Sequence, residues 1–175
     1  MKIVHLLVLA AFCFIQSFAQ NGYPTPPKTP NQLFYIQHSN NYNTYVYEAN
    51  IRAGKIDASK PINEYRIVYT EGAVKKPLTS IQKKMAYGMT LLANSSQLYE
   101  FRLAATDKIH FFLTTSKGEH PQMYVVINQR KLYIEKLFVQ LEEGFLNTST
   151  EAKYVLFYGR DYESGEAVVE KLKLD

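Results

Sequence analysis

Apolar and polar residues alternate with a period of two along most of the chain from Leu33 onward. In residues 43–52, one face carries Tyr45, Tyr47, Ala49 and Ile51. Successive side chains of a β-strand point to opposite faces, so the pattern predicts strands rather than helices. We expect about nine strands, over residues 33–39, 43–52, 64–71, 97–104, 109–115, 123–128, 131–141, 154–158 and 168–174.

The alternation also predicts which strand residues share a face. In the third strand these are Tyr65, Ile67 and Tyr69, and in the fourth they are Tyr99, Phe101 and Leu103, which we expect to be buried. In the strand over 131–141 the shared face comprises Tyr133, Leu137 and Val139. Short strands at this spacing predict a mainly β domain, either an antiparallel barrel or a sandwich.

One short helix is predicted, over residues 79–87. Thr79 or Ser80 can cap its N-terminus, and Gly88 is placed for a left-handed C-terminal cap. The apolar stripe of this helix, which we expect to pack on the core, comprises Leu78, Ile81 and Met85. Around the helix, four lysines form a basic corner that is most simply a solvated face, with contact to anionic lipid or glycan as an alternative; they are Lys75, Lys76, Lys83 and Lys84.

The first nineteen residues have the features of a secretory signal peptide. Lys2 supplies a positive charge, an apolar run follows, and small residues at Ser17 and Ala19 fit a cleavage site before Gln20. The alternative is an uncleaved membrane anchor, although the run is shorter than a span requires. We therefore expect a secreted or periplasmic protein with no transmembrane segment after cleavage. Residues 20–32 form a proline-rich, extended and exposed arm, and residues 33–175 form one domain.

Composition narrows the function classes. The chain has 20 basic and 16 acidic residues, which is too small an excess for a nucleic-acid binder. Its one cysteine, Cys13, lies in the predicted signal peptide, so the mature protein would have no disulfide and no thiol nucleophile. Tyrosine is abundant, with 14 residues, and tryptophan is absent. Tyrosine favours the half-buried surfaces of sheets.

No motif identifies a catalytic residue, a metal site or a cofactor. The three histidines of the mature chain, His38, His110 and His120, lack metal-ligand spacing. The acidic turn near Gly165 does not have the spacing of a calcium-binding loop. Among polar residues within apolar strands, Glu48 and Arg66 could face each other on neighbouring strands, either as an exposed pair or as the lining of a cavity.

Three runs of sequence resemble a known family. They are FYIQHSNNYNTYVYEAN, PLTSIQKKMAYG and YVLFYGRDYESGEAVVEKL. Together they are similar to a family of small secreted proteins, mainly from Bacteroidetes-type bacteria, that is described as a domain of unknown function. The resemblance covers about residues 33–174. It implies a secreted single domain and supplies no activity and no catalytic residue.

The favoured interpretation is a non-enzymatic binding domain that holds a small apolar or aromatic ligand against its tyrosine-bearing strands. Its candidate ligand-binding residues are Tyr45, Tyr47, Tyr65, Arg66, Tyr69 and Glu71. One alternative is a structural or interaction protein of the cell envelope with a filled core. A less favoured one is a hydrolase using convergent carboxylates such as Glu48 and Glu71. No cofactor is expected, and the partner is unknown.

Overall fold

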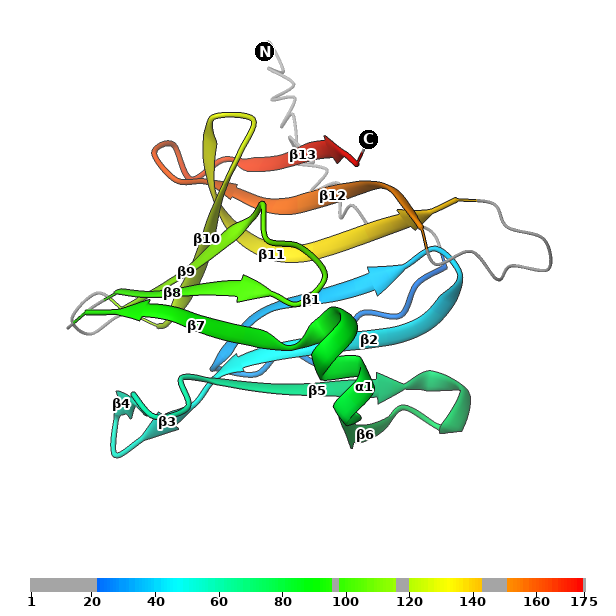
Figure 1. The fold of residues 1–175 in the computed structure, drawn as a ribbon, viewed down its shortest axis with the longest axis horizontal. Helices are drawn as coiled ribbons and strands as arrows, with labels where there is room; N and C mark the ends of the chain where they lie inside the picture. The colour runs from blue at the N-terminus through cyan, green and yellow to red at the C-terminus, as the bar shows by residue number, and fades with distance from the viewer. Residues whose placement is uncertain (1–21, 96–97, 116–119, 143–150, 175) are drawn as a thin grey trace, which may run out of the picture.

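The structure, a computed structural model, describes residues 22–95, 98–115, 120–142 and 151–174. The predicted signal peptide and its cleavage site lie outside these residues. Most of the described chain forms an eleven-stranded sheet that curls into an open half-barrel (Figure 1). Its main path runs through β6 (Val74–Pro77), β5 (Ile62–Val68), β2 (Asn41–Ala49), β1 (Gln32–His38), β11 (Arg130–Leu141), β10 (Gln122–Ile127), β9 (His110–Thr114), β8 (Leu98–Leu103) and β7 (Met89–Asn94).

The long strand β11 organises this sheet. Its first residues pair with β10, and its later residues pair in parallel with β1, from Tyr35 opposite Lys136 to His38 opposite Val139. Its other edge pairs with β12 (Ala152–Asp161), which pairs in turn with β13 (Ala167–Lys173). The mainly β prediction is confirmed, but the sheet is mixed and open rather than a closed antiparallel barrel. The parallel pairing joins distant parts of the chain, and no local turn signal encodes it.

The concave face of the sheet forms the main core. Tyr99, Phe101 and Leu103 are buried there, as the alternation predicts. Phe34 from β1 stacks on Tyr47 from β2, with ring centroids 4.4 Å apart, and both are fully buried. Aromatic rings supply much of the buried apolar area of a domain, so these stacks stabilise the curl of the sheet.

The opposite face of β1, β2 and β5 is buried too. Val46, Tyr65 and Ile67 form a second apolar cluster there. The proline-rich arm packs against this side of the molecule: the amide of Gln37 donates to the Pro24 carbonyl at 2.7 Å, and Pro26 is buried. The arm is extended, as predicted, but the expectation that it is exposed is wrong at these contacts, because it satisfies polar groups that the sheet leaves open.

A β-bulge in β11 changes which residues share a face. The register with β12 shifts between Ile134 and Lys136, so Leu137 lies in the main core while Tyr133 points to the other face. The prediction that Tyr133 shares a face with Leu137 and Val139 is therefore wrong. One extra residue reverses the alternation beyond it. Gly159 lies opposite the bulge, where an added Cβ would stand 2.0 Å from the Tyr133 carbonyl oxygen.

The predicted helix is present as α1 (Ser80–Gln82), continued by the π-helical turn η2 (Lys83–Tyr87). Thr79 caps it through a capping box with Gln82. Gly88 is extended, with φ −71°, so the left-handed cap predicted there is wrong. Glycine is needed for a different reason, because a Cβ would stand 2.3 Å from the Lys83 carbonyl oxygen.

The expected burial of the helical stripe is also wrong in part. Leu78 is buried, but Ile81 and Met85 are exposed. The wide π-helical turn changes the angular spacing of side chains, and Tyr87 packs against the core in their place.

The structure also shortens one predicted strand and adds others. The strand predicted to end at Glu71 ends at Val68, where the 3-10 turn η1 (Tyr69–Glu71) leads to Gly72 with φ +80°. Strands β6, β7 and β4 (Lys55–Ile56) were not predicted. The strand predicted over residues 43–52 is interrupted at Asn50, and its last two residues form β3 (Ile51–Arg52), which pairs with β4 in a small separate hairpin. In the described part of the chain, no helix is long and apolar enough to cross a membrane.

Candidate functional site

The two ends of the curled sheet approach each other along a seam, across which the described residues form no strand ladder. β6 covers the edge of β5 only from Tyr65 to Val68. The first residues of β5 therefore face β7, at the other end of the sheet. A side chain bridges this seam: Glu64 Oε1 accepts a hydrogen bond from the Met89 backbone N–H at 2.7 Å. This hydrogen bond links the two ends of the half-barrel across the seam, beside the apolar residues of β5, β7 and β8 that pack in the main core.

A cleft of about 560 Å³ opens along the seam. Its apolar lining comes from Ile62, Leu91 and Phe101, on β5, β7 and β8. Its polar lining comes from the loop before β5, from β5 itself, from the helix and from the start of β7, and includes Lys60, Glu64, Ser80, Lys83, Lys84 and Thr90. Clefts that combine an apolar lining with a few polar groups are typical ligand sites.

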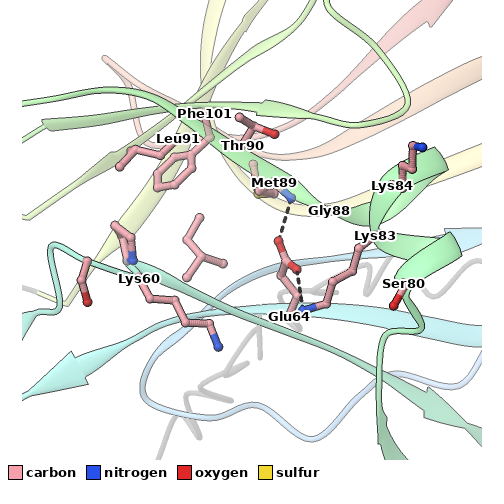
Figure 2. Close-up of a pocket in the computed structure, with 13 residues that line it drawn as sticks. Lys60, Glu64, Ser80, Lys83, Lys84, Gly88, Met89, Thr90, Leu91 and Phe101 are labelled. Atoms are coloured by element: carbon pink, nitrogen blue, oxygen red, sulfur yellow. Dashed lines mark hydrogen bonds and ion pairs between the residues drawn. The ribbon is translucent and has the colours of Figure 1, made fainter.

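The chemistry of the cleft centres on Glu64. Figure 2 shows its carboxylate reaching both the Met89 amide and the Lys83 ammonium group. Its side chain is only 12% exposed, and Lys83 Nζ lies 3.9 Å away. Burial raises the pKa of Glu64, while the Met89 N–H and the charge of Lys83 act in the opposite direction. Lys83 and Lys60 therefore lie near a carboxylate whose protonation is favoured by burial.

The strand edges along the seam also present backbone groups. The Pro61 carbonyl accepts from Asn50 N on the β2 side, and backbone groups alternate sides along a strand. The backbone groups of Ile62 and Glu64 therefore face the seam. On β7, the Met89 amide points to the seam, so the Leu91 amide does too. Such edge groups can bond to a ligand.

Two of the predicted ligand-binding residues pack into the core. Tyr45 stacks on Tyr87 with ring centroids 3.5 Å apart. Tyr47 is fully buried, and its hydroxyl donates to the Tyr87 carbonyl at 2.8 Å. Neither residue lines the cleft. Both contact other protein rings in place of a ligand.

The other four candidates lie elsewhere. Tyr65 and Tyr69 belong to the opposite face, around the second apolar cluster. Arg66 pairs with Tyr45 in the register of β2 and β5, so it shares the concave side, and its buried Nε has no hydrogen-bond partner among the described residues. Glu71 is exposed and forms an ion pair with Lys76. The structure therefore divides the six residues among three places.

Glu48 and Arg66, considered above as a cross-strand pair, lie on opposite faces of the sheet. Glu48 instead accepts hydrogen bonds from Thr29 of the arm, at 2.8 Å, and from Tyr65, at 2.9 Å. Lys75 Nζ lies 3.8 Å from it. Glu48 thus fastens the arm to the sheet, whereas Glu71 pairs with Lys76.

A buried histidine lies at the end of β1. His38 is 9% exposed and meets the rings of Tyr45 and Tyr87 edge-on, with centroids 5.7 and 5.5 Å away. Its Nδ1 has no hydrogen-bond partner in the part of the chain that the structure describes. Burial lowers the pKa of His38 to about 4. The imidazole is therefore neutral at physiological pH.

Little in the sequence indicates the cleft. Because Tyr65 and Ile67 share one face of β5, Glu64 must lie on the other, but both faces are buried and the pattern does not say which is concave. Leu91 belongs to β7, which was not predicted at all. Among the described residues, no group of three metal-ligating side chains could hold a metal ion.

A family model described as a domain of unknown function, DUF4833, matches residues 34–171. The chain belongs to this family. The match spans the sheet from β1 into β13 and includes both walls of the cleft. No curated protein and no solved structure matches the chain.

Proposed function

We propose that this protein is a non-enzymatic binding domain, exported by a Bacteroidetes-type bacterium, whose ligand occupies the seam cleft. The ligand has a small apolar or aromatic part that rests on Ile62, Leu91 and Phe101. It also has an anionic group that meets Lys60 and Lys83. The observation that carries the proposal is the cleft itself, where an apolar lining, lysines and strand-edge amides converge.

This proposal moves the ligand away from the tyrosines first considered. A ligand on Tyr45 or Tyr47 would have to displace the Tyr87 and Phe34 rings that stack on them. That filled arrangement favours the second candidate function, an envelope structural or interaction protein. The cleft needs no such displacement, which is why it is the better binding site.

Native mass spectrometry tests the binding proposal. The protein is purified from the envelope of its own host, and the retained mass is compared with that of a Lys60→Gln/Lys83→Gln variant. We expect the wild type to retain a small molecule that the variant loses. The matched control is Lys173→Gln, on β13, which does not line the cleft, and this variant should retain the molecule. A wild type with no retained molecule, or a variant that retains it fully, would favour the structural function.

Export is part of the same proposal and is tested separately. The N-terminus of envelope-fractionated protein should be Gln20, because Ser17 and Ala19 fit the peptidase site. N-terminal sequencing that finds Met1 would show that the leader is retained.

A further inference from the structure

One face of the helix over residues 80–87 carries the most exposed large apolar side chains in the described structure. Ile81 is 75% exposed and Met85 is 68% exposed. They are four positions apart, so they lie next to each other on the helix surface. Neither lines the seam cleft. The apolar pair is therefore separate from the proposed ligand site, although Lys83 and Lys84 of the same helix line that site.

The helix that carries this pair is firmly held. Leu78 is buried just before it, the Thr79 capping box fixes its first turn, and Tyr87 at its end stacks on Tyr45. Exposure of Ile81 and Met85 is thus a property of the packed fold. Large exposed apolar side chains on a fixed surface commonly mark an interaction site.

The charges around the pair are mainly positive. Lys84 follows Ile81 by three positions and precedes Met85, so it lies beside the pair, and it is exposed. Lys83 is two positions from each of them and lies on the side of the helix that carries its ammonium group to Glu64 in the cleft. The side chain of Lys83 is 48% exposed, whereas that of its partner Glu64 is 12% exposed. The ammonium groups therefore reach solvent while the neighbouring carboxylate is screened. An apolar pair beside an exposed lysine is complementary to a surface that is apolar inside and anionic outside.

We propose that this face docks on an anionic lipid membrane, with Ile81 and Met85 entering the interface and Lys84 beside them contacting headgroups. A protein partner fits less well, because a stable interface buries roughly 800 Å² on each side and two side chains offer far less. A membrane interface requires only shallow apolar insertion and charge attraction. The attraction weakens with salt, because Lys84 is exposed.

Vesicle co-sedimentation tests this docking. Vesicles of phosphatidylglycerol and phosphatidylcholine in equal amounts are compared with vesicles of phosphatidylcholine alone. We expect the wild type to bind only the anionic vesicles. The Ile81→Ser/Met85→Ser variant should bind them about tenfold more weakly or worse. Lys84→Gln should weaken binding roughly fivefold.

The matched control is Val126→Ser on β10, since Val126 is also apolar and 53% exposed. It should bind like the wild type, and thermal unfolding confirms that every variant folds. The proposal is overturned if the wild type does not bind anionic vesicles, if it binds neutral ones equally, or if the Ile81→Ser/Met85→Ser variant binds as the wild type does. Because that variant leaves the cleft lysines intact, the result is independent of ligand retention in the cleft.

Discussion

Protonation of His38 should make the protein less stable in mild acid. The pKa of His38 falls from 6.5 to about 4 on folding, because the ring is buried against Tyr45 and Tyr87. Above pH 6.5 both the folded and the unfolded chain carry a neutral imidazole, so the group contributes nothing there. Between pH 6.5 and 4 the unfolded chain binds the proton more tightly, and folding stability is lost.

The size of the loss follows from the shift in pKa. At about 1.4 kcal/mol per pKa unit, the full loss is about 3 kcal/mol, reached below pH 4. About 2 kcal/mol of it should appear between pH 7.5 and pH 5, before most carboxylates titrate. This is a large part of the stability of a domain of this size.

Guanidinium unfolding at pH 7.5 and pH 5 measures this loss, and His38→Phe isolates it. Phenylalanine keeps a ring in the aromatic cluster but binds no proton, so the variant should lose about 2 kcal/mol less than the wild type between the two pH values. The control is His120→Gln, since His120 is exposed and should leave the pH dependence unchanged. If His38→Phe and the wild type lose equal stability, His38 is not the group responsible.

Two further substitutions test the packing. Phe101→Ala should cost about 3–5 kcal/mol in unfolding free energy, because Phe101 is buried, while Glu100→Ala should cost at most about 0.5 kcal/mol. Equal losses of unfolding free energy in denaturant melts would mean that the assignment of Phe101 to the buried face of β8 and Glu100 to the other is wrong. Gly159→Ala should cost about 3 kcal/mol, because its Cβ would collide with the Tyr133 carbonyl. Gly165→Ala, which has open space but φ +71°, should cost only about 1 kcal/mol; a Gly159→Ala variant as stable as this control would mean that β11 can yield at the bulge.

The strands predicted best are those with one buried face. In β8, Tyr99, Phe101 and Leu103 alternate with Glu100 and Arg102, so the pattern contains both the strand and its inward face. In β5 the pattern gave the strand and the shared face of Tyr65 and Ile67, but not which side is concave, because apolar clusters cover both sides.

The missed elements depend on distant contacts. β6 and β7 are short edge strands, and β7 is mostly exposed, so neither has a strong alternating pattern. The exposure of Ile81 and Met85 depends on the π-helical turn, which propensities do not predict. The cleft needs the two ends of the sheet to meet, so its residues could not be grouped from their spacing alone.

The parallel pairing of β1 with β11 also constrains how the chain acquires its structure. Tyr35 must wait for Lys136, which is synthesised roughly one hundred residues later. Until then the edge of β1 is an open template for pairing with another chain. Such non-local pairings slow folding and expose nascent chains to aggregation. A chain truncated after β10 would keep that edge open permanently, so we expect C-terminal deletions to give aggregates rather than smaller folded domains.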